Sequence, residues 1–286
     1  IEAELHRVGR NRVQVNRQRV NRMRDLLGVV QVTVFSPDDL ELVKAGPSLR
    51  RRWIDDALLQ RHPRHDALRA DLERILKQRN ALLRSTPGRL DADAAFTLDV
   101  WDQKLSDIGS RLREAREELL DELRPALTEA YAAVANRAVA TDASYEASWD
   151  GSLEAALAAV RDHDVRRGVS TIGPHRDEIV LTIDGRPART HASQGEQRSL
   201  ALALRLAADR VVRTGAGTSP VLLLDDVFSE LDPGRAAALL DALPDAQRLL
   251  TTAAGLPVSA TPERVLTIAD GTVSVVGGGA VSGEGT

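Results

Sequence analysis

Two adjacent carboxylates directly follow a short apolar run in the last third of the sequence. The run Val221 to Leu224 is preceded by Pro220 and followed by Asp225 and Asp226. A run of this length fits a strand of a parallel sheet that is buried on both faces. Because open α/β sheets bind ligands beyond the carboxyl ends of their strands, Asp225 could hold a phosphate-bound Mg²⁺ and Asp226 could orient an attacking water. Taken alone, a pair of acids that caps the next turn is the more common arrangement.

A second stretch, about thirty residues upstream, has the features of a helix start. Ser193 is a good N-cap, and Glu196, three residues later, can complete a capping box. Apolar residues recur behind it at helical spacing, namely Leu200, Leu202, Leu204, Leu206 and Ala207. The free backbone N–H groups, the hydroxyl and the close approach allowed by Gly195 make such a start an anion site. By itself, a plain capped helix explains the stretch equally well.

Together, the two stretches resemble the signature motif, Walker B strand and D-loop of the ABC-type ATPases. The signature is matched by Ser193, Gln194, Gly195 and Glu196, the Walker B strand by Leu222 to Asp225, and the D-loop by Ser229 to Asp232. The resemblance implies ATP and Mg²⁺ as cofactors, with Asp225 on the metal and Asp226 as the catalytic carboxylate. It also implies that the signature residues of one head close on the nucleotide of a second head, with Ser229 and Asp232 in the D-loop.

One part of that machinery has no match in the sequence. No Gly-x-x-x-x-Gly-Lys-Ser/Thr loop, which would hold the β and γ phosphates, occurs in the 286 residues. The chain begins at Ile1, in strand-like sequence, so we expect a stretch that lacks its N-terminal part and does not hydrolyse ATP alone. At the switch position, where many ABC ATPases have histidine, Thr251 or Thr252 stands instead. The sequence therefore does not show which residue would contact the γ-phosphate at the switch position.

Composition narrows the class of protein. The chain has 43% hydrophobic and 28% charged residues, as ordinary globular proteins do. It has no cysteine, which excludes disulfides and thiolate chemistry and fits a cytoplasmic protein. No apolar run is long enough to span a bilayer, so we expect no membrane contact. The net charge of −4 gives no overall nucleic-acid footprint, and DNA contacts must come from local patches.

The N-terminal strands carry a candidate patch of this kind. Residues 5–8 and 13–15 flank Gly9-Arg10-Asn11, a hairpin signal, and Val29 to Phe35 predicts a further strand. The candidate DNA-binding residues are Arg7, Arg10, Arg12, Arg17 and Arg19. A phosphate-binding patch and an edge strand protected by charge are equally good explanations.

The middle of the chain predicts helices and a polar turn. Residues 66–137 carry two apolar seams separated by a break at residues 85–88, which indicates a short antiparallel helical hairpin. The basic triplet Arg50 to Arg52 could contact DNA or form the solvated face of a preceding helix, and we favour the solvated face. His175, Arg176 and Asp177 are interpreted as a structural polar turn that borders the nucleotide or a dimer partner. Residues 153–160 predict a helix, and residues 179–183, 248–252, 265–268 and 272–276 predict strands.

Within the ABC superfamily the chain is similar to the RecF family of bacterial DNA repair and replication proteins. The similarity rests on Phe35 to Leu40, Gly46-Pro47 with the following Arg-rich helix, Gly173 to Asp177, Ser193 to Arg198 and Leu224 to Asp232. It implies an ATP-dependent homodimer that clamps double-stranded DNA at single-strand gaps in the response to DNA damage, including the SOS response. RecO and RecR would be its partners in loading recombinase. The alternatives are a structural head of SMC or Rad50 type and a non-enzymatic DNA- or mediator-binding module.

The resemblance also implies the fold class and its division along the chain. We expect an α/β ABC-type ATPase head, with a P-loop NTPase-like sheet that lacks its N-terminal part, and a helical lobe with a short antiparallel coiled-coil arm. The first half of the head would take residues 1–47, and the helical lobe would take residues 48–165. The second half of the head would take residues 166–276, followed by a flexible tail at 277–286.

Overall fold

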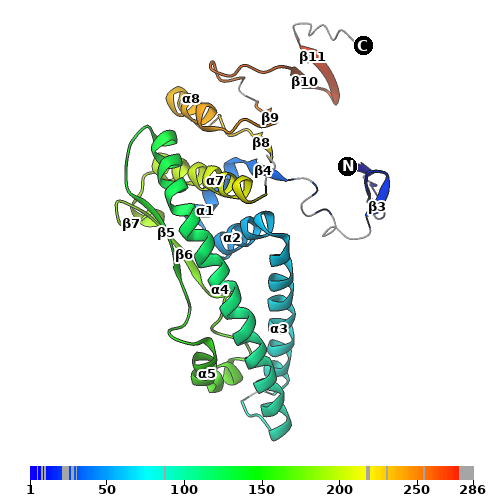
Figure 1. Ribbon diagram of the computed structural model, residues 1–286, viewed down its shortest axis with the longest axis vertical. Coiled ribbons are helices and arrows are strands. Elements are labelled where there is room, and N and C mark those ends of the chain that lie inside the picture. The colour runs from blue at the N-terminus through cyan, green and yellow to red at the C-terminus, as the bar shows by residue number, and fades with distance from the viewer. Residues whose placement is uncertain are drawn as a thin grey trace.

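The molecule consists of a head and a helical arm that projects from it (Figure 1). The computed structural model describes residues 1–276 apart from Leu5, Val8, Arg10, residues 21–25, 27–28 and 30, Pro87, residues 217–219, Glu230 and Ala254. The longest helix, α4 (Ala92–Ala135), runs through both parts and is about 66 Å long at 1.5 Å per residue. The α/β head with a helical lobe, as expected from the sequence, is confirmed.

A small parallel sheet forms the part of the head that carries the two acids. Its strands are β4 (Val32–Phe35), β8 (Val221–Asp225) and β9 (Arg248–Thr251), in the order β4-β8-β9. Leu222 and Leu224 are buried, whereas Val221 and Leu223 are only half-buried. The prediction that β8 is covered on both faces is therefore only half met, because the described helices bury one face of the sheet.

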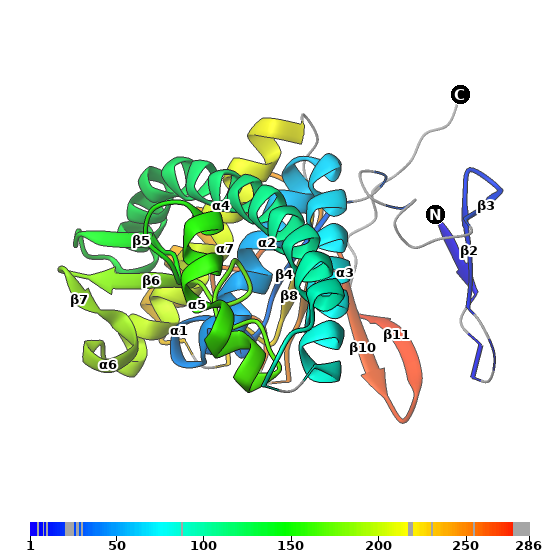
Figure 2. The same ribbon diagram turned by 90° about the horizontal axis from the view of Figure 1, so that it is seen from below.

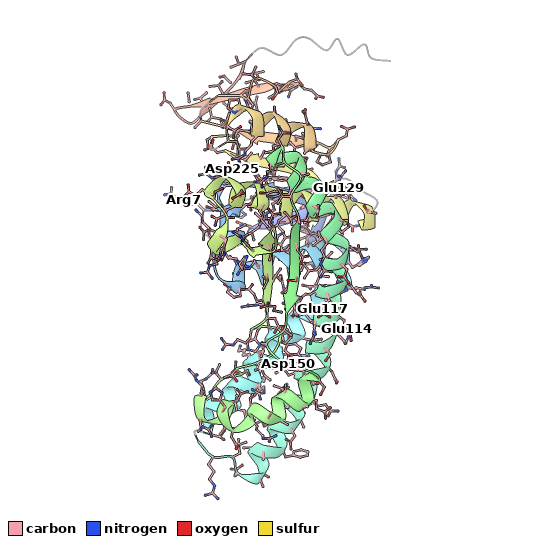
Figure 3. All side chains as sticks on the ribbon, turned by 90° about the vertical axis from the view of Figure 1, so that its left-hand side faces the viewer. Arg7, Glu114, Glu117, Glu129, Asp150 and Asp225 are labelled. Atoms are coloured by element: carbon pink, nitrogen blue, oxygen red, sulfur yellow. The ribbon has the colours of Figure 1, made fainter. Side chains whose placement is uncertain are left out.

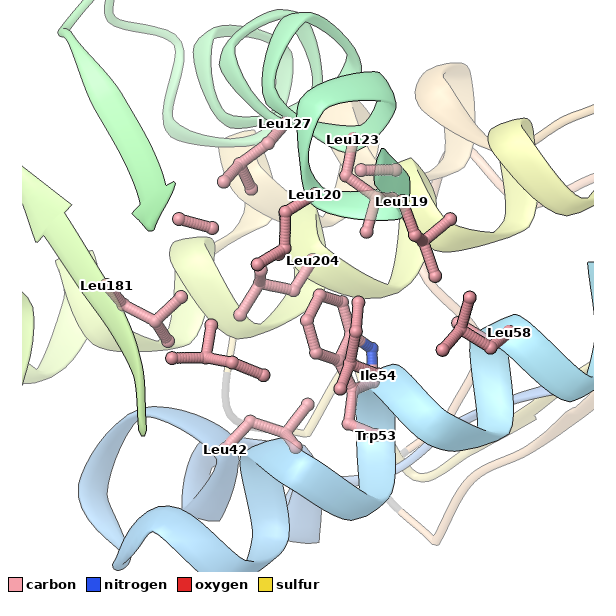
Figure 4. Close-up of a cluster of buried hydrophobic side chains, with 14 of the residues drawn as sticks. Leu42, Trp53, Ile54, Leu58, Leu119, Leu120, Leu123, Leu127, Leu181 and Leu204 are labelled. Carbon is pink, nitrogen blue, oxygen red and sulfur yellow. The ribbon is translucent and has the colours of Figure 1, made fainter. Parts of the chain in front are cut away.

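Helix α7 (Gln194–Ala216) connects the two hydrophobic clusters of the molecule. Leu200 and Leu204 lie in the larger cluster, between the helices and the second sheet, and Figure 4 shows Leu204 facing α4 and α2. Leu202 and Leu206 lie in the smaller cluster with Phe35 of β4. A helix with apolar residues on two faces must be buried on both, and this places α7 between the sheet and the helical lobe. Helix α8 (Pro233–Ala242) completes the smaller cluster.

The arm is the antiparallel helical hairpin predicted from the apolar seams. Helix α3 (Asp66–Ser85) and the first half of α4 run side by side (Figure 1), with the break between Ser85 and Ala92. The seam residues Leu105, Leu112 and Leu119 are almost completely buried. Short elements lead into the arm, namely η2 (Pro37–Leu40), α1 (Glu41–Lys44), α2 (Pro47–Arg61) and η3 (Pro63–His65).

A second, antiparallel sheet packs beside α4 and was only partly predicted. Its strands are β5 (Thr141–Glu146), β6 (Glu178–Ile183) and β7 (Arg186–Pro187). Strand β6 was expected, but β5 lies in the stretch expected to be the helical lobe and was missed. Helix α5 (Leu153–Arg167), longer than predicted, and the short α6 (Ala188–His191) flank this sheet (Figure 2).

The two ends of the chain each form a small antiparallel sheet. The N-terminal sheet pairs β1 (Glu2–Glu4) with β2 (Arg12–Val15), and β3 (Gln18–Val20) joins it. Strand β2 was expected, but the first strand was predicted at residues 5–8 and lies at Glu2–Glu4 instead. The predicted C-terminal hairpin pairs β10 (Val265–Ala269) with β11 (Thr272–Val276). Both lie beside the head and away from the arm (Figures 1 and 2).

Two arginines are buried where the sequence predicted otherwise. Arg50, assigned to a solvated face, is 5% exposed and forms an ion pair with Glu178 at 2.8 Å. That interpretation was wrong for Arg50, because the helix face that carries it packs against β6. Arg79, which interrupts the apolar seam of α3, is fully buried and forms ion pairs with Asp102 and Asp164.

Candidate functional site

The carboxyl end of the parallel sheet brings together Asp225, Asp226 and Thr251. Asp225 is the last residue of β8 and lies opposite Thr251 of β9 in the register. The Thr251 hydroxyl donates a hydrogen bond to Asp225 Oδ1 at 2.6 Å, and the Asp226 amide donates to the Thr251 carbonyl at 3.1 Å. Asp225 is exposed, and Figure 3 shows it in the head, away from the arm. The sequence therefore predicted the position of this polar edge correctly.

Asp226 is held in an unusual conformation for a residue with a side chain. Its φ is 50°, in the left-handed region that disfavours residues other than glycine, and its Oδ1 is buried without a hydrogen-bond partner in the described structure. The following turn is closed by the Ser229 hydroxyl, which donates to the Asp226 carbonyl at 2.9 Å. Backbone strain and an unsatisfied carboxylate oxygen in one residue are typical of sites that a ligand completes.

The same edge can accommodate a magnesium ion only with help from a ligand. Among the described residues, no group of three or more His, Asp or Glu side chains could hold a metal ion. Mg²⁺ usually takes one or two carboxylates and completes its shell with water and phosphate oxygens. Asp225, exposed at the strand end, fits that role, and the metal would supply positive charge against bound phosphates.

The predicted signature forms the exposed start of α7. The Ser193 amide donates to Glu196 Oε2 at 2.8 Å, and the Glu196 amide donates to Ser193 Oγ at 3.3 Å, which is the predicted capping box. The Ser193 hydroxyl also donates to Glu196 Oε2 at 2.8 Å, and the two hydrogen bonds from the Ser193 amide and hydroxyl lower the pKa of Glu196. Ser193 and Gln194 are exposed, while Gln197 is buried and donates to the Ala188 carbonyl at 3.1 Å. Gln197 thus anchors the turn to the chain, whereas Ser193 and Gln194 remain accessible to solvent.

Arg235 lies against the signature glycine and was not found by sequence reasoning. A Cβ atom on Gly195 would lie 2.6 Å from Arg235 Nη1. Arg235 belongs to α8, whose N-cap is Asp232 of the predicted D-loop, and Asp232 Oδ1 accepts the Arg235 amide at 2.9 Å. The D-loop and the signature of one chain therefore meet through this side chain. No spacing pattern links residues 195 and 235, so only the fold could reveal the contact.

Of the two candidate switch residues, Thr251 contacts the acids. Thr252 Oγ1 instead donates to the Gly255 carbonyl at 3.1 Å. The polar turn at His175 lies elsewhere, at the start of β6. Burial lowers the pKa of His175 to about 4, so its imidazole is neutral near pH 7.

The candidate DNA-binding arginines belong to the N-terminal sheet and its connections: Arg12 lies in β2, Arg19 in β3, and Arg7 and Arg17 lie between strands. This sheet lies beside the head (Figure 1). Arg7, Arg12, Arg17 and Arg19 are exposed, and Arg12 lies 3.7 Å from Glu4. Arg10 lies outside the described residues. The exposed positions agree equally with phosphate binding and with charge protection of a small sheet, as the sequence did.

Comparisons with known proteins place this geometry in a family. No protein-family model matches the chain. It is 43% identical to the DNA replication and repair protein RecF of Frankia alni, over 89% of this chain and 72% of that protein. It is 40% identical to the protein of the same name from Paenarthrobacter aurescens, over 100% of this chain and 79% of that protein. The chain belongs to the RecF family.

Solved RecF structures agree with the assignment. The chain matches the recombination mediator protein RecF in complex with ATP with a TM-score of 0.82 and 26% identity, over 94% of this chain and 74% of that one. A second RecF structure, named as a RecF-ATPrS complex in the RecFOR pathway, gives the same TM-score at 25% identity. The RecF identification made from the sequence motifs is confirmed, and the chain is a DNA replication and repair protein. No helix in the described ranges combines the length and apolarity that crossing a membrane requires.

Proposed function

We propose that this RecF-family chain works in an ATP-dependent dimer that clamps double-stranded DNA beside single-strand gaps. Recombinase would then be loaded with RecO and RecR, in the response to DNA damage that includes the SOS response. The observation that carries the proposal is the unsatisfied oxygen of Asp226, held by a strained backbone next to the Asp225–Thr251 pair. An unpartnered carboxylate oxygen at a strand end favours a bound ligand there, and Mg²⁺ with the terminal phosphate of ATP would supply the positive charge and the oxygen ligands.

The dimer follows from the open signature. Ser193 and Gln194 are exposed at the start of α7, where the positive end of the helix dipole favours an anion. The Ser193 amide and hydroxyl are held by Glu196 in the capping box, so the exposed Gln194 and the helix start would meet a phosphate held by another head. ATP would then drive association because it contacts both heads only when they are together.

The test measures nucleotide-dependent association in sedimentation velocity. The chain is run alone and with an equimolar amount of an ATP-binding RecF, each with and without ATP and Mg²⁺. We expect an ATP-dependent complex that the substitution Ser193→Arg weakens at least tenfold. Ser152→Arg is the matched control, because Ser152 is an exposed N-cap serine of α5 that accepts the Ala155 amide. If the Ser193→Arg variant associates with ATP as strongly as the unaltered chain does, the proposal is contradicted.

A non-enzymatic DNA- or mediator-binding module is the second candidate. The observation in its favour is the absence of a Gly-x-x-x-x-Gly-Lys-Ser/Thr loop from the printed sequence. Equilibrium dialysis of labelled ATP against the chain separates the two. DNA binding without any nucleotide binding or nucleotide-dependent association would favour the module.

A further inference from the structure

A second cationic surface lies at the base of the arm, where α2 meets the loop of residues 170–177. Arg51 Nη1 donates to the Asp177 carbonyl at 2.6 Å. Arg176 is exposed, and its Nε and Nη2 lie 3.4 and 3.3 Å from the Ser170 carbonyl. Arg52, next to Arg51, is also exposed. We call Arg51, Arg52 and Arg176 the arm-base patch.

The charges of this patch are not neutralised by ion pairs. Arg51 and Arg176 donate to neutral carbonyls, and among the described residues neither lies within ion-pair distance of a carboxylate. The acids nearby are occupied. Glu178 pairs with Arg50 at 2.8 Å, Asp55 with Arg116 at 2.8 Å, and Asp56 with Arg69 at 3.1 Å. The buried Asp177 accepts hydrogen bonds from the Tyr145 hydroxyl and the Ser148 amide.

The loop that presents Arg176 is fixed by two buried arginines. Arg116 Nη1 donates to the Pro174 carbonyl at 2.8 Å, and Arg79 Nη1 donates to Ser170 Oγ at 2.8 Å. Both arginines are at most 2% exposed. Replacing a buried ion pair with apolar residues is often neutral or stabilising, so these networks are better explained by the geometry that they impose than by stability.

The packing around α4 confirms how closely the loop is held. A Cβ atom on Gly109 of α4 would lie 3.2 Å from Pro174 and 2.4 Å from the Leu153 side chain. The Pro174 side chain therefore packs closely against α4 at Gly109, two residues before Arg176.

The pKa values of His175 and Arg51 are affected by the charges around them. After burial, which is the largest cause, the charges of Arg176, Arg51 and Arg79 all lower the pKa of His175. Burial lowers the pKa of Arg51 as well, the charge of Arg116 lowers it further, and the charges of Glu178, Asp177 and Asp55 raise it. The three guanidinium groups named with His175 are thus close enough to act on one imidazole.

We propose that the arm-base patch binds backbone phosphates of duplex DNA, as a contact site separate from the N-terminal arginines. Guanidinium groups that retain free N–H donors and lack a carboxylate partner are suited to phosphate, which they can bind through two parallel hydrogen bonds. The choice of DNA as the polyanion rests on the proposed function. The patch itself follows from the side chains alone.

The experiment is fluorescence anisotropy of a labelled duplex with a single-strand gap, measured at several salt concentrations. For the double variant Arg51→Gln/Arg176→Gln we expect about a tenfold loss of affinity at low salt. The slope of log K against log salt should fall by roughly two, because each phosphate contact contributes about 0.9. The control Arg74→Gln/Arg210→Gln removes the same charge from two exposed arginines that pair with Asp71 and Glu129. Equal affinities and slopes for the two double variants would overturn the proposal.

A second measurement on the unaltered chain protects the test against misfolding of the variant. Phenylglyoxal modifies accessible arginines, and mass spectrometry of peptides reports which ones react. Bound duplex should protect Arg51 and Arg176 but leave Arg74 reactive, and an absence of protection would count against the patch. If Arg51→Gln/Arg176→Gln loses DNA but keeps the Ser193-dependent association with ATP, both ideas stand. If the unaltered chain shows no ATP-dependent association, but duplex still protects Arg51 and Arg176, only the nucleotide clamp is rejected.

Discussion

The sheet edge at Asp225 and the loop of residues 170–177 handle charge in opposite ways. At the edge, two carboxylates lie side by side with a single hydroxyl as a partner, and the Oδ1 of Asp226 has none in the described structure. In the loop, the buried Asp177 accepts two hydrogen bonds, and the buried Arg116 pairs with Asp55 and donates to a carbonyl. The edge presents carboxylate oxygens that a ligand can complete, whereas most buried charges beside the loop pair with one another, although Arg79 Nη2 and His175 Nδ1 have no partner in the described structure.

This difference separates groups that bind from groups that position. Burying an unpartnered polar atom costs free energy, so a protein keeps one only where something else compensates. A network whose members satisfy one another has no need of a ligand, and its role is to hold its neighbours. Substitutions of the buried charges that hold the loop should therefore act on stability, and substitutions at the edge should act on binding.

The largest expected effect is on the loop network. Arg116→Met leaves Asp55 without its partner, and we expect the free energy of unfolding to fall by about 3–5 kcal/mol. Urea denaturation followed by circular dichroism measures the change. Asp225→Asn, at the exposed edge, should change it by less than about 0.5 kcal/mol. The double variant Asp55→Leu/Arg116→Met should recover most of the loss, and a loss below about 1 kcal/mol for Arg116→Met would show that the network is not coupled to folding.

A smaller effect is expected from pH, through His175. The pKa of His175 is lowered to about 4 in the folded chain, mainly by burial, against about 6.5 when unfolded. Between these values the unfolded chain binds a proton that the folded chain does not, so stability falls as pH drops from about 6.5 toward 4. The contribution of this residue between pH 7 and pH 4.5 is roughly 2–3 kcal/mol. Urea midpoints are measured at pH 7 and pH 4.5 for the unaltered chain and for His175→Gln. The midpoint of the unaltered chain should fall more between these pH values than that of His175→Gln, and equal falls would rule the effect out.

The contact between Gly195 and Arg235 predicts a coupling of about 1 kcal/mol. Ala in place of Gly within a helix normally stabilises by about 1 kcal/mol, but here the new methyl group would displace the Arg235 guanidinium. Gly195→Ala should therefore raise the free energy of unfolding only slightly by itself. In an Arg235→Ala background, it should raise it by the full amount. A double-mutant cycle of urea denaturation curves measures this difference. Additive effects would mean that Arg235 does not rest on the glycine.

The elements that the sequence predicted well are those set by local patterns. The apolar run of β8, the capping box of α7 and the two seams of the arm each follow from neighbouring residues, and the structure has all of them. Strand β5 was missed because Thr141–Glu146 has little apolar content. Its strand character comes from pairing with β6, about forty residues later.

The parts that could not be predicted depend on contacts between distant residues. Arg79 interrupts a seam in the sequence, but in the fold it meets Asp102 and Asp164. The sequence predicted that Arg50 is solvated, but in the fold it forms an ion pair with Glu178 of β6. The site itself was half predictable: the acids at the end of β8 follow from the strand, whereas the role of Thr251 required the register between β8 and β9.

The last predicted effect comes from Asp226, and unlike the losses expected for Arg116→Met and for His175 at low pH, it is a gain in stability. Glycine adopts a φ of 50° without strain, so Asp226→Gly should raise the free energy of unfolding by about 0.5–1 kcal/mol, although it removes a carboxylate. Asp226→Asn separates the two causes, because Asn tolerates the left-handed region but lacks the charge. Urea midpoints measure the gain, and nucleotide-dependent association should weaken in both variants. If Asp226→Gly destabilised the chain instead, its carboxylate would already be compensated within the fold, and the contrast between edge and loop would fail at its central residue.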